Sequence, residues 1–274
     1  MILSCLKPKP FRKEFMQLIA LAFLSFLSFP GATAHANVPR ATSPEDRAVI
    51  QRRRVVLIRR GKLARDFPHK KHAVVTYPVV TGLRDPEVLR RVRALLDFKN
   101  IFDYSLKEYR DDAWLSEFSY VVNHNSNSLL DITFTQSGSG AYPDDHEKHF
   151  LINLKDGSLV KAADAFEPDK LNALAAEVDR KLQHELKELA VENAKDKDAG
   201  AEERESVNQA YQNLKFEKSH LDEFSVSRKG ITFLYDAGFP HVIQALEPAG
   251  RYLLTFAELK PYIKPNGPLG QFAR

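Results

Sequence analysis

Residues 168–190 (PDKLNALAAEVDRKLQHELKELA) form the clearest helical pattern in the chain. Their apolar residues recur every three or four positions: Leu171, Leu174, Val178, Leu182, Leu186 and Leu189. This spacing puts them on one side of a helix, and Pro168 is tolerated in its first turn. We therefore expect one long amphipathic helix whose apolar face packs against another layer.

Segments in which apolar and polar residues alternate lie on both sides of this helix and predict β-strands. They cover residues 71–80, 114–122, 129–136, 149–154, 224–227, 231–235 and 252–256. Asp156-Gly157 and Lys229-Gly230 are expected to form tight turns, because Gly accepts a positive φ. Short helices are expected over 86–96 and 258–263. The pattern indicates an α+β fold, with an antiparallel sheet packed against one long helix and shorter helices.

Two polar segments interrupt this pattern. Residues 191–208 are charged and poor in apolar side chains, which predicts an exposed linker or a solvated extension of the helix. Residues 137–145 (SGSGAYPDD) are expected to form a loop between two strands.

The first 36 residues have the layout of a secretory signal peptide. Lys7, Lys9, Arg12 and Lys13 precede an apolar run at 16–29, and small residues stand at Ala34 and Ala36. The run of 14 residues is shorter than the ~20 that a membrane span needs. We expect export to the periplasm or the extracellular space with cleavage after Ala36; the alternative is an uncleaved segment that tethers the protein to the membrane.

Removal of the signal peptide changes the composition. Cys5, the chain's one cysteine, leaves with it, so the mature chain can form no disulfide between its own cysteines and has no thiol nucleophile. Four Lys/Arg and Glu14 also leave, so 40 basic and 36 acidic residues become 36 and 35. A net charge near neutral gives no argument for nucleic acid as a partner.

Residues 37–66 are expected to form a basic N-terminal helix or arm ahead of an α+β domain at 67–274. Ser43, Pro44, Glu45 and Asp46 are typical of a helix start. This segment predicts contact with an anionic envelope surface through five arginines: Arg52, Arg53, Arg54, Arg59 and Arg60. The alternative is a solvated helix that docks by its aliphatic residues alone.

No motif identifies a reaction. His146-Glu147-Lys148-His149 places its histidines three apart in an expected strand, whereas zinc hydrolases need them four apart on a helix. Gly138-Ser139-Gly140 lacks the spacing of a serine hydrolase elbow. Carboxylates are plentiful but nothing selects a glycosidase pair. We therefore expect no cofactor and no metal, and a non-enzymatic role is favoured over an enzymatic one.

The glycine-containing segment at 137–145 is a candidate recognition site. Gly138 and Gly140 allow close backbone approach, Tyr142 offers an amphipathic ring, and Asp144 and Asp145 suit a cationic partner. The alternative is a strand connection that needs glycine for its geometry alone.

Several short motifs between residues 74 and 272 resemble one family. They are Tyr77-Pro78, Gly82-Leu83, Gly138 to Pro143, Phe150 to Gly157, Ala163 to Phe166, Gly230 to Phe233, Ala249-Gly250 and Leu259 to Tyr262. In these motifs the chain resembles an extracytoplasmic domain of unknown function, found in lysozyme-sensing anti-sigma factors and ahead of some peptidoglycan deacetylases.

The resemblance implies an exported binding domain whose partner is a cell-wall-active protein such as lysozyme, or an envelope polymer such as peptidoglycan. Tyr142 stands where that family has a loop histidine, so no role of that histidine carries over. Because about 15 residues precede the apolar run, we expect neither a sigma-binding part nor a deacetylase domain in this chain. The alternatives are an envelope hydrolase with a dispersed carboxylate site and a membrane-associated structural protein.

Overall fold

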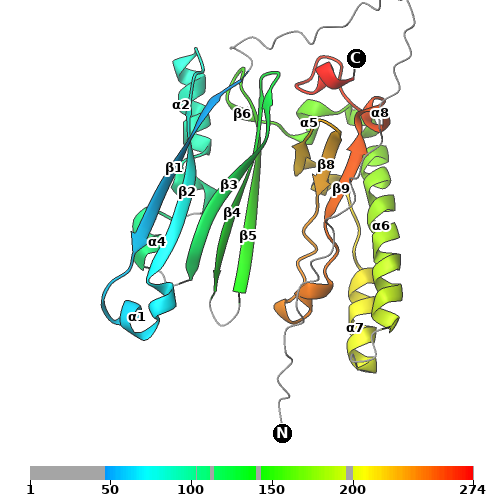
Figure 1. The fold of residues 1–274 in the computed structure, drawn as a ribbon. Coiled ribbons are helices and arrows are strands. Elements are labelled where there is room, and N and C mark those ends of the chain that lie inside the picture. Colours follow the sequence, from blue (N-terminus) through cyan, green and yellow to red (C-terminus); the bar gives the residue numbers. More distant parts are fainter. Residues whose placement is uncertain (1–46, 103, 112–113, 140–142, 196–199, 274) are drawn as a thin grey trace, which may run out of the picture. The chain divides into compact units, whose positions relative to one another are not determined.

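A six-stranded sheet forms the first layer of the computed structural model, which describes residues 47–273 apart from 103, 112–113, 140–142 and 196–199 (Figure 1). Its strands follow the sequence order: β1 (Val49–Ile58), β2 (His72–Thr81), β3 (Leu115–Ser126), β4 (Leu129–Ser139), β5 (Pro143–Asn153) and β6 (Ser158–Leu159). Neighbouring strands are antiparallel except β2 and β3, which pair in parallel through Val74–Glu117 and Val75–Phe118.

The parallel pair requires a crossover, and three helices provide it. These are α2 (Pro86–Leu95), α3 (Phe98–Phe102) and α4 (Leu106–Asp111). The short helix expected at 86–96 is α2. Asp85 caps it, because its Oδ1 accepts hydrogen bonds from the backbone N–H groups of Glu87 and Val88 at 2.8 and 3.2 Å. The connection from β1 to β2 contains α1 (Gly61–Asp66) and the 3₁₀ turn η2 (Pro68–Lys70).

An aromatic cluster joins these helices to the sheet. The Phe98 ring lies 4.5 Å from that of Phe118 on β3 and 5.2 Å from that of Tyr109 on α4. Phe98 also meets Tyr77 of β2 edge-on, at 6.3 Å between ring centroids. One face of the sheet is therefore closed by a core that spans both sides of the parallel pair.

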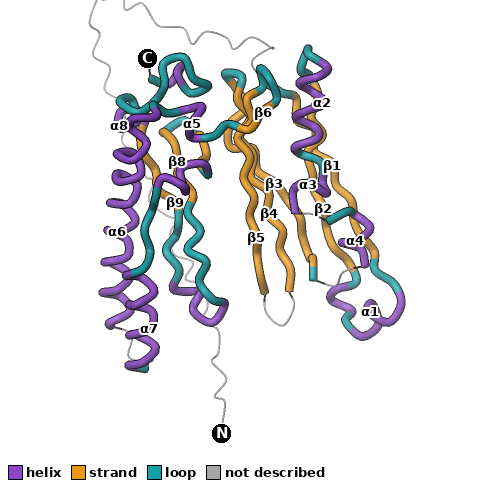
Figure 2. Tube along the Cα trace, turned by 180° about the vertical axis from the view of Figure 1, so that it is seen from behind, coloured by secondary structure: helices purple, strands orange, loops and turns teal. Residues whose placement is uncertain are grey.

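The second layer contains a three-stranded antiparallel sheet and the long helix. Its strands are β7 (Phe224–Val226), β8 (Gly230–Leu234) and β9 (Arg251–Thr255). Its α-helices are α5 (Ala162–Ala165), α6 (Leu171–Lys195), α7 (Ala201–Gln212) and α8 (Phe256–Leu259), with 3₁₀ turns η3 (Pro168–Lys170), η4 (Lys218–Asp222), η5 (His241–Leu246) and η6 (Gly270–Phe272). The 25 residues of α6 run beside β8 and β9 in both views (Figure 2). The expected stripe packs against them, since Leu174, Val178 and Leu182 are fully buried.

The two faces of the six-stranded sheet differ in chemistry. Val75, Phe118 and Phe134 belong to the face that α2, α3 and α4 cover. On the opposite face, strand pairing aligns Val56, Val74, Glu117, Ser137 and Asp145 as neighbours across β1 to β5. The second layer packs on this polar face beside β5, where Leu129 and Leu151 join its apolar core.

The α+β class is confirmed, and two local expectations are wrong. Residues 49–58 form strand β1 and not a helix, because their β-branched residues pair with β2 along the whole strand. The 137–145 segment is mostly strand, since β4 reaches Ser139 and β5 begins at Pro143.

The charged segment 191–208 differs from both alternatives: α6 continues only to Lys195, a separate helix, α7, begins at Ala201, and the segment is not wholly exposed. Val207 on α7 is fully buried in the second-layer core, together with Tyr211. No helix among the described residues is long and apolar enough to cross a membrane. The predicted signal peptide, its cleavage site and the helix start at Ser43 lie outside the described residues.

Candidate functional site

Cationic side chains gather where β1 turns into β2. We call this group the basic tip: Arg60, Lys62, Arg65, Lys70 and Lys71 from the β1–β2 connection, and Arg110 from the end of α4. All are exposed except Lys70, which is half-buried. Asp66 and Asp111 are the nearest acids in the same segments, so positive charge dominates this end of the first layer.

Apolar side chains are exposed among these cations. Ile58 is 48% exposed and Phe67 is 46% exposed, and the Lys70 ammonium lies 5.8 Å from the centre of the Phe67 ring. Ile58 also lines an open hollow of about 550 Å³ with Arg60, Arg65 and Lys71. Cations interleaved with apolar groups can contact an anionic surface by charge and by burial together.

Arg59 does not belong to this exposed set, so its predicted role at an anionic surface is wrong. Its side chain is 2% exposed, and its guanidinium donates to the backbone carbonyls of Lys70, Tyr109 and Leu115 at 2.7, 3.2 and 2.7 Å. A planar donor fork satisfies three carbonyls that face the interior. Arg59 therefore holds α4 and the start of β3 against the end of β1. The other four arginines of that expectation, Arg52, Arg53, Arg54 and Arg60, are exposed.

The predicted recognition segment is only partly described. Gly140 and Tyr142 lie outside the described residues, and Asp144 is placed only by the pairing of its backbone with Gly138. Asp145 is exposed on β5. Gly138 has a structural role, because a Cβ there would lie 2.3 Å from the Trp114 carbonyl oxygen and 2.6 Å from its ring.

A buried carboxylate joins the two layers. Asp131 on β4 is fully buried, and its Oδ1 accepts hydrogen bonds from His149 Nε2 at 2.8 Å and Asn123 Nδ2 at 2.7 Å. Its Oδ2 accepts from the backbone N–H of Val226 on β7. This arrangement satisfies every oxygen of the carboxylate from within the fold and leaves no position for a substrate.

The histidines singled out in the sequence do not form a metal site. His149 faces Asp131, while His146 is exposed and lies beside the Trp114 ring at 5.4 Å. Among the described residues no group of three or more His, Cys, Asp or Glu side chains could hold a metal ion. His124 is half-buried, and burial lowers its pKa below the ordinary value.

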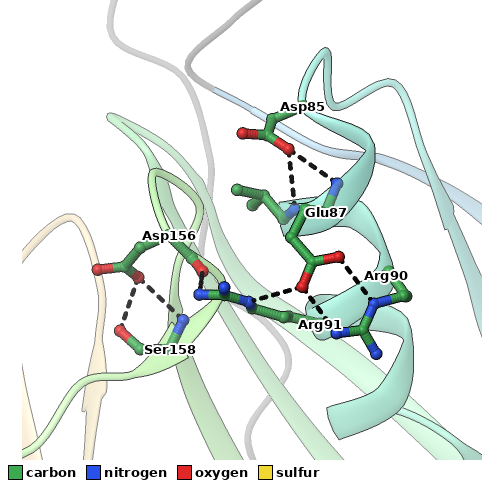
Figure 3. Close-up of polar contacts among 7 residues, drawn as sticks. Asp85, Glu87, Arg90, Arg91, Asp156 and Ser158 are labelled. Carbon is green, nitrogen blue, oxygen red and sulfur yellow. Dashed lines mark hydrogen bonds and ion pairs between the residues drawn. The ribbon is translucent and has the colours of Figure 1, made fainter.

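A polar cavity of about 570 Å³ lies between the β5–β6 hairpin and the segment after α8. Asp156, Ser158, Glu167, Lys264 and Asn266 contribute polar groups to its wall. Asp156 is held in place, since its Oδ1 accepts from both the backbone N–H and the hydroxyl of Ser158 (Figure 3).

The rim of this cavity is tied to α2. Arg91 reaches the backbone carbonyl of Asp156 at 3.3 Å, and Glu87 joins Arg90 and Arg91 (Figure 3). Hydrogen bonds from Arg90 and Arg91 lower the pKa of Glu87 to about 2. These contacts give Asp156 and Ser158 a structural role in the hairpin.

The basic tip includes residues that the sequence alone does not bring together. Arg110 is 50 positions from Arg60, and the fold of α4 brings both to a second open hollow beside Val56 and Ile58. Asp131 carries no local signal either, because a single acid in an alternating strand is usually solvent-facing. The run of cations at 59–71 was the usable signal.

Comparisons with known proteins agree on the fold and give no activity. No family model matches the chain, and no curated protein matches it. A DUF3298 family protein from Pseudomonas aeruginosa has a similar structure over 82% of this chain and 98% of its own, at 13% identity and a TM-score of 0.51. A member of the same family from Bacteroides fragilis is similar over 85% and 99%, at 14% identity and a TM-score of 0.54. At these identities the likeness is one of fold alone.

Proposed function

We propose that this chain is an exported, non-enzymatic binding domain of the cell envelope, and that its basic tip binds a phosphate- or carboxylate-bearing surface there. The observation that carries the proposal is the placement of cations beside exposed apolar groups. Ile58 shares two open hollows with Arg60, Arg65, Lys71 and Arg110, and the Lys70 ammonium lies over the exposed Phe67 ring. The predicted signal peptide supports an envelope location.

The energetics of such a surface follow from its charges. Each Lys or Arg close to an anionic surface contributes about 1 kcal/mol, and the attraction falls off within a Debye length. Loss of three cations should therefore weaken binding by about 3 kcal/mol, or roughly a hundredfold. Because the charges are exposed, raising the salt concentration should also weaken binding.

The test is co-sedimentation of the protein with two probes: vesicles that contain phosphatidylglycerol, and purified peptidoglycan with its anionic polymers. Arg60→Ala/Arg65→Ala/Lys71→Ala should lose binding to whichever probe the protein recognises. The matched control is Lys187→Ala/Lys218→Ala/Lys229→Ala, which removes three exposed cations from the second layer.

Equal binding by the two triple variants, or binding that survives high salt, would contradict the proposal. Lysozyme, the cationic protein that the sequence resemblance implies, belongs in the same experiment. Its retention by both triple variants would move recognition away from the basic tip, toward the acidic residues near 144–147.

A further inference from the structure

Strand β1 is an edge of the six-stranded sheet, and the direction of its backbone groups can be worked out. Arg59 N–H donates to the Lys71 carbonyl at 2.9 Å, which makes Arg59 and Lys71 a hydrogen-bonded pair. Such pairs alternate along an antiparallel ladder, so Leu57, Val55 and Arg53 also direct their backbone toward β2.

The residues between them direct their backbone outward. Arg52, Arg54, Val56 and Ile58 present N–H and C=O groups away from β2, and no described residue hydrogen-bonds to these groups. The outward edge therefore runs for about seven residues, long enough to accept a further strand.

The side chains of these four residues lie on one face of the sheet, and all four are exposed. Arg52 and Arg54 are exposed, Val56 is 43% exposed and Ile58 is 48% exposed. Beside Val56 and Ile58 lies an open hollow of about 650 Å³, with Arg60 and Arg110 against Asp111 on its rim. A strand added here would lie beside Arg52 and Arg54 at one end and beside Val56 and Ile58 at the other. At that second end the arginines of the hollow outnumber its one acid, Asp111.

We infer that the edge of β1 binds an extended acidic segment of a partner protein by strand addition. Backbone hydrogen bonds to Arg52, Arg54 and Val56 would supply affinity, and alternate acidic side chains would face the arginines. A second copy of this chain is a poor occupant, because its own edge strand at 49–58 carries no acidic side chain to place opposite Arg52 and Arg54. This inference stands on the unpaired edge of β1 and is independent of the proposed function.

The test uses a labelled heptapeptide in which glutamate alternates with threonine, beginning and ending on glutamate and blocked at both ends. This pattern reads the same in both directions, so it fits a parallel or an antiparallel addition. Binding is followed by fluorescence anisotropy, and hydrogen exchange is followed residue by residue. The amides of Arg52, Arg54 and Val56 should exchange at least about tenfold more slowly in the complex.

Two variants separate strand addition from charge attraction. Val56→Pro removes one outward N–H at an edge position that tolerates proline, and it should weaken binding about tenfold without a change of charge. Arg52→Glu/Arg54→Glu should abolish binding of the glutamate peptide and create binding of its lysine counterpart. If Val56→Pro fails to fold, the exchange rates of the Arg54 and Val56 amides in the unaltered chain still separate strand addition from charge attraction.

Arg65→Ala/Lys71→Ala is the control, because it removes charge from the basic tip but not from the edge. It should leave peptide affinity within about twofold. Peptide binding without slower exchange at Arg54 and Val56 would overturn strand addition, and so would the absence of binding by the unaltered chain. Neither result would bear on binding of vesicles or wall polymer by the basic tip.

Discussion

Asp131→Asn should destabilise the protein strongly, although the side chain barely changes shape. The carboxylate receives three donors on two oxygens: His149 and Asn123 on Oδ1, and the Val226 N–H on Oδ2. An amide keeps only one oxygen. The orientation that loses fewer hydrogen bonds keeps this oxygen at Oδ1, where two donors meet, and turns the NH2 group toward the Val226 N–H. This orientation leaves two donors facing each other in the interior.

The cost can be worked from these contacts. Losing the charge weakens the two remaining hydrogen bonds from about 2 kcal/mol to about 1 kcal/mol each. The unpaired Val226 N–H adds about 1–3 kcal/mol. The free energy of unfolding should therefore fall by about 3–5 kcal/mol, the range for breaking a buried charged group's contacts. The loss should not depend on salt, because Asp131 is fully buried.

The assay is urea unfolding followed by two probes. Trp114 is the chain's one tryptophan and lies in the first layer, while far-UV circular dichroism is dominated by α6 and α7 in the second. Both transitions should move to lower urea in Asp131→Asn, and Asp145→Asn, an exposed acid on β5, should stay within about 0.5 kcal/mol. A loss below about 1 kcal/mol for Asp131→Asn would refute the reasoning that this carboxylate holds the layers together.

Three further outcomes are expected. Arg59→Met should lower the free energy of unfolding by about 3 kcal/mol, because three buried carbonyls lose their donor, whereas Arg60→Met should change it little; thermal unfolding compares the two. Gly138→Ala should cost about 2 kcal/mol or more and alter Trp114 fluorescence, since the new Cβ would overlap the Trp114 carbonyl; an unchanged emission spectrum would count against that contact. The Glu87 carboxyl should titrate by NMR near pH 2, so its bonds to Arg90 and Arg91 persist above its unfolded pKa and are lost as the pH falls through 2; a midpoint near 4.5 would mean that they do not form in solution.

The sequence predicted the elements whose local pattern and tertiary setting agree. The 3.6-residue stripe of α6, the short helix α2 and the Asp156-Gly157 turn were all confirmed. Each is determined by contacts within a few residues, or by one apolar face that must be buried.

Strand β1 was missed because its signals conflict. Ser43 to Asp46 favour a helix start, and three consecutive arginines obscure the alternation that a strand would show. The β-branched residues Val49, Ile50, Val55 and Val56 were the better guide, since pairing with β2 decides their conformation. Val207 was missed because one apolar residue in a charged segment gives no periodicity.

The candidate site was predicted only as composition. The run of cations at 59–71 predicted a basic surface. The prediction wrongly included Arg59, which is buried, and it missed Arg110, which is distant in sequence. Whether a cation is a surface charge or an interior donor depends on the carbonyls around it, which the fold supplies.

The parallel seam between β2 and β3 also has a mechanical consequence. The first layer consists of two antiparallel ribbons, β1–β2 and β3 to β6, and the registered pairing between them is confined to Val74 and Val75 with Glu117 and Phe118. Under a pulling force at the N-terminal end, the pairing between β2 and β3 should break first, so that the β1–β2 ribbon detaches as a unit. Resistance to that force would come from the Phe98 ring, wedged between Tyr77 on one ribbon and Phe118 on the other, more than from the backbone.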